Sequence, residues 1–392
     1  MRLTAEHEMF RSTVARIVDT EINPYVDEWE RTGIFPAHDL FPKLAEAGLF
    51  GLEYDPEYGG QGADATFTVL MAEELGRSRS FGVPMAIAVQ TDMATPALHR
   101  FGSDELKRRF LVPAIRGEQV AAVAVTEPDA GSDVAAIRTR AARDGDEWVI
   151  DGTKTFITNG TQADWICVLA RTAPGPGYSG MSQIIVPTDS PGFGISRKLD
   201  KLGNRASDTA ELAFMTCRVP VANTVGEIGR GFQQQMAQFQ PERLIGSALA
   251  VGQCTWALEE TIAYVRDRHV FGEPLAANPH VQYKLAELSA EVEMLRQFVY
   301  TTADSAAAGH DVTRFATIAK LKAGRLVRRI ADECLQLFGG LGYMEENWTA
   351  RYFRDSRLLS IGGGADEVML RVLARVDGIA IEPRRDEGSS HG

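Results

Sequence analysis

Cysteine is scarce in this sequence: there are four among 392 residues, and none forms a CxxC pair. Cys167, Cys217, Cys254 and Cys334 are far apart, which argues against a zinc site and against a disulfide framework. We therefore predict no metal centre. Scattered cysteines are typical of a reducing compartment, so we expect a cytoplasmic protein.

Long apolar runs are also missing. No segment approaches the length of a membrane-spanning helix, so we predict no membrane span. The first residues, MRLTAE, lack the apolar core of a signal peptide and the Arg- and Ser-rich composition of a transit peptide. A bacterial cytoplasmic location is the resulting expectation.

Positive charge is in deficit, with 41 Lys and Arg against 53 Asp and Glu and a net charge of −12. This balance argues against nucleic acid or an anionic membrane as the main partner. An anionic ligand would need a local cluster of donors. Composition is otherwise that of a globular protein, 44% hydrophobic and 24% charged, and the length allows two or three domains.

The periodicity of apolar residues changes twice along the chain. Residues 1–119 show helical spacing, residues 120–226 consist of short β-rich runs between turns, and residues 227–383 are helical again. The polar tail, 384–392, is predicted to be disordered. The pattern predicts a helical domain, a compact β barrel or sandwich, and a second helical domain.

Several local signals fix element ends. Thr4 is suited to cap a first helix, and Pro36 stands at the start of another. Asp151-Gly152, between two β-rich runs, predicts a hairpin turn.

Two motifs in the β region have the chemistry of a ligand site. Residues 124–133, AVTEPDAGSD, combine a strand end with small residues and the hydroxyls of Thr126 and Ser132. Residues 156–160, FITNG, put Phe156 and Thr158 on one strand face, suited to stacking on a ring and hydrogen bonding to it. On chemistry alone, a capped turn and a half-buried strand explain these residues at least as well.

Three motifs in the second helical region offer groups for anions. Residues 336–343, QLFGGLGY, expose backbone N–H groups, although without the strand and GK[ST] of a Walker loop. Residues 362–367, GGGADE, open the last helix, and Arg268 ends a long one. Taken singly, a glycine helix cap, a flexible linker and a dipole-stabilising arginine account for them equally well.

Glu242 follows Pro241 inside an apolar helical stretch, where a proline is expected to kink the helix. A carboxylate on a buried helix is a candidate general base. An exposed helix carboxylate is the commoner role for Glu, and the residues alone leave both open.

Taken together and in order, these motifs resemble the acyl-CoA dehydrogenase family over residues 4–380. The resemblance implies an α+β, mostly α fold: a helical N-terminal domain, a small β-barrel middle domain and a C-terminal four-helix bundle, in a homotetramer with FAD. For the flavin of the same chain, the resemblance implies contacts from Val125 and Thr126 at the pyrimidine edge and from Phe156 and Thr158 beside the isoalloxazine. For the FAD of a neighbouring subunit, it implies contacts from Arg268 and Phe271, and from Gln336, Gly339 and Gly340 near the pyrophosphate or adenosine. Ala365 and Glu367 are also implied to bind FAD. The implied substrate contacts are Ser132 at the acyl-CoA phosphates, Arg243 and Gly362.

The resemblance also locates the base. Many members carry a Glu where this chain has Gly363, whereas long-chain and isovaleryl-type members carry it at the position of Glu242. This chain is similar to the second branch. The implied reaction is α,β-dehydrogenation of an acyl-CoA to a trans-2-enoyl-CoA, with Glu242 as base, the Gly363 backbone N–H as donor to the thioester oxygen, and an electron-transferring flavoprotein as acceptor. An acyl-CoA oxidase or another flavoprotein of this fold is the alternative.

Overall fold

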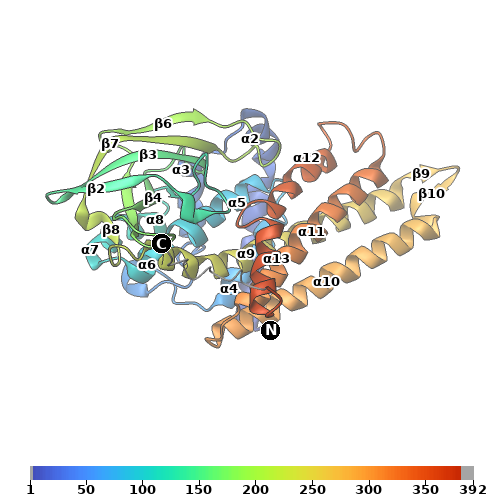
Figure 1. Cartoon of the computed structure of the whole chain (residues 1–392). Helices are drawn as coiled ribbons and strands as arrows, with labels where there is room; N and C mark the ends of the chain where they lie inside the picture. Colours follow the sequence, from blue (N-terminus) through green and yellow to red (C-terminus); the bar gives the residue numbers. More distant parts are fainter. Residues whose placement is uncertain (1–2, 381–392) are drawn as a thin grey trace, which may run out of the picture.

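The computed structural model describes residues 3–380, apart from the side chain of Gln240, and the predicted disordered tail 384–392 lies outside the described residues. Helices form both ends of the chain, and one sheet forms the middle (Figure 1). The predicted class, mostly helical with a β middle domain, is confirmed. None of the described helices is long and apolar enough to cross a membrane.

The N-terminal helices pack as short pieces. They are α1 (Ala5–Ile17), α2 (Val26–Thr32), α3 (Ala37–Glu46), α4 (Ala65–Gly76), α5 (Gly82–Ala88), α6 (Pro96–Phe101), α7 (Asp104–Leu106) and α8 (Val112–Ile115). Thr4 caps α1 as predicted, because its side chain accepts a hydrogen bond from the His7 N–H, and α3 begins directly after Pro36. Three π-helical segments, Val18–Ile22, Val89–Ala94 and Lys107–Leu111, were not predicted.

The middle of the chain is one sheet. Its strands are β1 (Ala121–Ala124), β2 (Arg140–Asp144), β3 (Glu147–Thr158), β4 (Trp165–Arg171), β5 (Met181–Pro187), β6 (Phe193–Lys198), β7 (Thr209–Pro220) and β8 (Thr224–Val225). They pair in the order β6-β7-β3-β2-β4-β5-β8, and β1 lies parallel to β4. Trp148, Ile166, Ile184 and Leu212, from four different strands, share one buried cluster. The sheet therefore curls around its own core, as a small barrel does.

The hairpin predicted at Asp151-Gly152 is wrong, because β3 runs straight through this pair. The turn lies at Gly145 and Asp146, between Asp144 and Glu147, which pair across β2 and β3. Gly152 has another role: a Cβ there would lie 2.5 Å from Thr139 Oγ1, so only glycine allows this close approach at a bulge of the strand.

The C-terminal part is a bundle of long helices. Its elements are α9 (Gly231–Asp267), the hairpin β9 (His269–Val270) and β10 (Glu273–Pro274), α10 (Pro279–Ala307), α11 (Thr313–Phe338), α12 (Trp348–Asp355) and α13 (Asp366–Val376). Helix α9 continues on both sides of Pro241.

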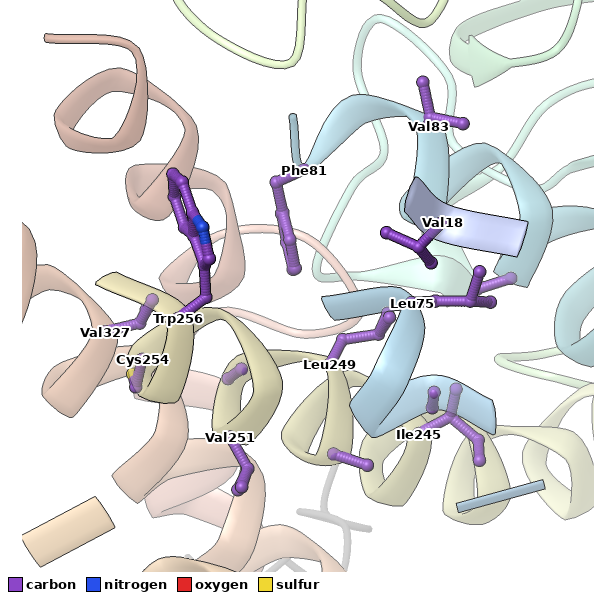
Figure 2. Close-up of a cluster of buried hydrophobic side chains, with 14 of the residues drawn as sticks. Val18, Leu75, Phe81, Val83, Ile245, Leu249, Val251, Cys254, Trp256 and Val327 are labelled. Atoms are coloured by element: carbon purple, nitrogen blue, oxygen red, sulfur yellow. The ribbon is translucent and has the colours of Figure 1, made fainter. Parts of the chain in front are cut away.

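Helices α4 and α9 meet backbone to backbone. A Cβ on Gly252 of α9 would lie 1.8 Å from the carbonyl oxygen of Glu73, and one on Gly76 of α4 would lie 2.1 Å from that of Leu249. Leu75, Leu249 and their neighbours fill the core around this crossing (Figure 2). The crossing joins the N-terminal helices to the bundle, and α9 carries Glu242 at one side of it.

Candidate active site

The Glu242 side chain is buried in α9, with 9% of the residue exposed. The Gln238 side-chain amide, one turn earlier, donates a hydrogen bond to Glu242 Oε1 at 3.3 Å and another to the Met93 carbonyl oxygen. Glu242 is therefore buried, as expected of a candidate base, and the alternative of an exposed helix carboxylate is wrong.

Burial raises the pKa of Glu242 to about 8. Hydrogen bonding from Gln238 lowers this pKa, the nearby carboxyl group of Asp92 raises it, and the charge of Arg243 lowers it. Burial also raises the pKa of Asp92 itself, to about 7. A carboxyl group whose pKa lies near neutrality is suited to accept a proton from a weak carbon acid.

Two cations tie the surroundings of Glu242 to the glycine segment before α13. Arg243 donates to Thr317 Oγ1 at 3.2 Å, and the buried Lys320, three residues later on α11, donates to the Gly364 carbonyl oxygen. Within the described residues, the buried Arg243 Nε has no hydrogen-bond partner. The neighbours of Glu242 and of Gly363 are thus held by one face of α11.

Gly363 offers a backbone donor. It is exposed, its φ is +62°, a Cβ there would meet nothing within 4 Å, and its N–H donates to no residue in the described part of the chain. This is the geometry of a free N–H beside open space. Glycine is suited to this position because other residues rarely adopt such a φ.

The predicted flavin contacts of the middle domain come together. The Thr155 N–H donates to the Thr126 carbonyl oxygen at 2.9 Å, which brings the end of β1 against β3. Phe156 is 69% exposed at a φ of +62°, and Thr158 is half-buried. A bulky residue held at positive φ with its ring in the open is strained, and such strain concentrates at functional sites.

A buried ion pair lies next to this contact between the Thr126 segment and β3. Lys154 Nζ donates to Glu127 Oε1 at 2.9 Å and to the Val125 carbonyl oxygen at 2.8 Å. Glu127 also accepts from the backbone N–H groups of Arg138 and Thr139. Burial alone would raise the pKa of Glu127, but Lys154 and these donors outweigh it and lower that pKa. Burial lowers the pKa of Lys154 to about 8.

A second group of predicted FAD residues lies elsewhere. Arg268 caps the end of α9, and Phe271 is fully exposed in the β9–β10 hairpin. The rings of Tyr264 and Phe338 stack with centroids 3.9 Å apart, so the glycine segment after α11 lies near this hairpin. Gln336, Gly339 and Gly340 are all exposed there. This end of the bundle points away from the sheet (Figure 1), so one chain does not bring the two groups together.

The remaining predicted residues are more dispersed. Ser132 is exposed in the segment between β1 and β2. The Gly362 N–H already donates to the Leu358 carbonyl oxygen at 2.8 Å. Ala365 is the N-cap of α13 and makes no side-chain cap, and Glu367 is exposed in the first turn of that helix.

Sequence reasoning missed several residues around these sites. Gln238 stands four residues before Glu242, a spacing that signals a shared helix face. Lys154 is a charge at an inward position of a strand, which is a signal for a buried pair. Asp92 belongs to a different helix, and the sequence gives no sign that it approaches Glu242.

The arrangement can hold a flat ring and remove a proton. The open Phe156 ring and the Thr126 and Thr158 hydroxyls offer the mixed aromatic and polar surface that suits a planar cofactor such as a flavin. No group of three or more metal-ligating side chains exists among residues 3–380.

Comparison with known proteins places these features in a family. Sequence profiles of the acyl-CoA dehydrogenase N-terminal, middle and C-terminal domains match residues 4–118, 122–217 and 229–376. A probable acyl-CoA dehydrogenase of Bacillus subtilis, YngJ, is 37% identical over 95% of this chain and 98% of its own. The mitochondrial long-chain specific acyl-CoA dehydrogenase of Rattus norvegicus is 36% identical over 95% of this chain and 86% of its own.

Solved structures agree. A probable acyl-CoA dehydrogenase from Mycobacterium abscessus superimposes with a TM-score of 0.93, at 40% identity over 96% of this chain and 99% of that one. A glutaryl-CoA dehydrogenase from Mycobacterium smegmatis in complex with FADH2 gives 0.91, at 30% identity over 97% of each chain. A structure described as the electron transferring flavoprotein of Acidaminococcus fermentans gives 0.92, at 32% identity over 96% of this chain and 98% of that one.

Proposed function

The chain belongs to the acyl-CoA dehydrogenase family and is an oxidoreductase, and we propose that it desaturates an acyl-CoA thioester to the trans-2-enoyl-CoA with Glu242 as the base. The observation that carries this proposal is the buried carboxyl group of Glu242, whose pKa is raised to about 8 and whose neighbour Arg243 contacts the same face of α11 that holds the segment of Gly363.

The protein's own groups have two tasks in this reaction. Glu242 takes the α-proton, and the Gly363 N–H donates to the thioester oxygen as negative charge develops there. Arg243 and Lys320 add positive charge on the same side of the site. A raised pKa makes Glu242 a stronger base than an exposed carboxylate. The difference between its pKa and that of the α-carbon of the thioester is therefore smaller.

The cofactor is proposed to be FAD. When bound, it supplies the acceptor for the β-hydrogen, which leaves as hydride. Val125, Thr126, Phe156 and Thr158 would hold the ring system, and support for the flavin comes from the M. smegmatis relative that binds FADH2. The protein residues orient the ring and exclude water from it.

The residues at the far end of the bundle are proposed to serve a second copy of the chain. Arg268 and Phe271 lie at the β9–β10 hairpin, and this end of the bundle points away from the sheet that carries Phe156 (Figure 1). Gln336 and Gly340 lie at the end of α11 near this hairpin. A homotetramer, in which each chain completes a neighbour's site, accounts for them.

An electron-transferring flavoprotein is the proposed electron acceptor, supported by the A. fermentans structural neighbour. A cytoplasmic location stays a prediction. The alternative of an acyl-CoA oxidase is tested by reducing the holoenzyme anaerobically with acyl-CoA, and then comparing its reoxidation by oxygen and by an electron-transferring flavoprotein.

The central test is Glu242→Gln. We expect this variant to keep its flavin and to lose about 10²–10⁴-fold of the rate at which acyl-CoA bleaches the flavin anaerobically, because the base is gone. Glu260→Gln, an exposed change on the same helix, is the matched control. Bleaching of Glu242→Gln at a rate close to wild type would overturn the proposal.

A further inference from the structure

The chain just before α13 is attached to α11 at two points. Ser360 is 5% exposed, and its Oγ donates to the Gly324 carbonyl oxygen at 3.1 Å. Four residues later, the Gly364 carbonyl oxygen accepts a hydrogen bond from Lys320 Nζ. Gly363, whose N–H is the proposed donor to the thioester oxygen, lies between these two attachments.

The glycines themselves do not fix the direction of this N–H. Gly362, Gly363 and Gly364 are consecutive, and the last two have φ values of +62° and +96°. Glycine loses more conformational freedom on folding than any other residue. The Gly362 N–H is bound to the Leu358 carbonyl oxygen, whereas the Gly363 N–H donates to no residue in the described part of the chain. Contacts from outside the segment must therefore hold this donor in one direction.

Lys320 is an unusual source of such a contact. The residue is 2% exposed, and a lysine buried to this degree is normally paired with a carboxylate. Among residues 3–380, Lys320 forms no ion pair, and it donates to a backbone carbonyl oxygen instead. Burial lowers its pKa to about 8, an effect that the charge of Asp366 partly opposes, but Asp366 pairs with Arg325 at 3.3 Å. An apolar side chain would cost less to bury, so stability alone does not explain a lysine here.

The same face of α11 also holds the side of the base. Thr317 precedes Lys320 by three residues, a spacing that puts both on one helix face. Its Oγ1 accepts from Arg243 at 3.2 Å, and Arg243 follows Glu242 directly on α9. The separation between the base and the Gly363 donor therefore depends on contacts made by α11.

We propose that Lys320 is a positioning residue for the proposed dehydrogenation, on which this inference rests: by holding the Gly364 carbonyl oxygen, it keeps the Gly363 N–H directed at the thioester oxygen. Lys320 itself touches neither the substrate nor the flavin, and it acts through the backbone. A donor stabilises developing negative charge most when it is already in place and needs no rearrangement during the reaction.

Two ligands that are not turned over measure the donor directly on the holoenzyme. A 3-ketoacyl-CoA has an acidic α-carbon and can bind as the enolate, which puts negative charge on the thioester oxygen, and its β-carbon has no hydrogen to lose. The S-(3-oxoalkyl)-CoA of the same length has a CH2 group in place of the thioester carbonyl. The ratio of the two dissociation constants therefore reports stabilisation of the thioester oxygen.

Lys320→Met should weaken binding of the ketoacyl-CoA by about tenfold or more and change that of the oxoalkyl-CoA by no more than about twofold, because only the first ligand uses the donor. With a substrate that is turned over, kcat should fall by about tenfold or more with little change in KM. Lys322→Met, which removes an exposed charge from the same helix, is the matched control. If both ligands bind more weakly by the same factor, the role of Lys320 is only structural and the inference fails.

Ser360→Ala separates position from charge. It removes the second attachment, which is uncharged, and should also weaken the ketoacyl-CoA selectively, by about threefold or more. Lys320→Gln removes the charge but keeps a donor, so it should retain more affinity than Lys320→Met. An effect of both Lys320 variants to the same extent, with none from Ser360→Ala, would show that charge acts and would overturn the inference. These two variants also provide the test if Lys320→Met does not fold.

The wild-type holoenzyme distinguishes this inference from the proposal beneath it. If the wild type binds the two ligands equally well, the site has no donor for the thioester oxygen, and the proposed dehydrogenation fails together with the inference. If the wild type prefers the ketoacyl-CoA and Lys320→Met keeps the whole preference, only the role of Lys320 is overturned.

Discussion

Gln238 Nε2 lies 3.3 Å from Glu242 Oε1, one helical turn before it. The same amide nitrogen donates to the Met93 carbonyl oxygen, which fixes the direction of the side chain. This contact stabilises the ionised form of Glu242, whereas burial stabilises the neutral form. The balance of the two sets the pH at which the base becomes available.

The rate of flavin reduction should depend on pH through Glu242. Its pKa of about 8 means that the carboxylate form increases as pH rises from 6 to 8. The second-order rate constant for anaerobic reduction by acyl-CoA should therefore rise by about tenfold per pH unit below the pKa and level off above it. Gln238→Leu removes a donor to the carboxylate and should move the midpoint to higher pH. A flat profile from pH 6 to 9 would contradict this assignment.

Moving the base to Gly363 should restore part of the activity. In the Glu242→Gln background, Gly363→Glu places a carboxyl group where a Cβ meets nothing within 4 Å. The φ of +62° costs a non-glycine residue about 1–2 kcal/mol, so we expect a small rescue with reduced stability. The anaerobic reduction rate of the double variant measures it, and Gly363→Gln in the same background is the control. Equal rates for the two double variants would argue against Glu242 and Gly363 facing one substrate.

Lys154 should stabilise the segments around Val125 and Phe156 that are proposed to hold the flavin, without itself touching the flavin ring. Lys154→Met leaves Glu127 buried without its cation and frees the Val125 carbonyl oxygen. We expect a loss of about 3–5 kcal/mol of stability and weaker FAD binding, because an unpaired buried charge is costly. Chemical denaturation and FAD titration measure the two effects. Adding Glu127→Gln should recover part of the stability, and no recovery would mean that the ion pair is not the cause.

The crossing of α4 and α9 should tolerate no side chain at Gly252. A methyl group there would lie 1.8 Å from the Glu73 carbonyl oxygen. Gly252→Ala should therefore destabilise the fold by at least about 1–3 kcal/mol, because the two helices must separate. Thermal denaturation gives the difference. Gly246→Ala, whose Cβ would lie 3.5 Å from Leu359, is the matched control on the same helix. Similar melting temperatures for the two variants would show that α4 and α9 can separate enough to admit a methyl group without loss of stability.

The sequence predicted well what is decided locally. Thr4 caps α1, and the last helix begins at Asp366, within the segment 362–367 that was predicted to open it, because capping and turn signals act within a few residues. The turn predicted at Asp151-Gly152 was wrong because Gly152 is needed for the close approach of Thr139. Thr139 is not a neighbour of Gly152 in the sequence, so a local pattern does not reveal this contact. The sheet order follows from contacts between strands far apart in the chain, which local patterns do not specify.

The candidate site divides in the same way. Glu242 was predicted through the resemblance, and its burial is now described. Asp92, which shifts the pKa of Glu242, comes from another helix, and only the packed structure brings the two together. A cavity of about 480 Å³ whose wall includes Gln238 likewise depends on segments far apart in the chain, among them residues 49–55, α4 and α9.

The contact between Gly76 and Gly252 has a consequence for how the family member adapts to new substrates. Because two backbones touch there, the helices α4 and α9 cannot move closer together at this crossing, and the crossing sets the separation between Thr68 on α4 and Gln238 on α9, which line one cavity. Selection for a different acyl chain would then have to act on the side chains of these two helices and on the segment 49–55, which also lines the cavity. Gly76 and Gly252 themselves would stay the same.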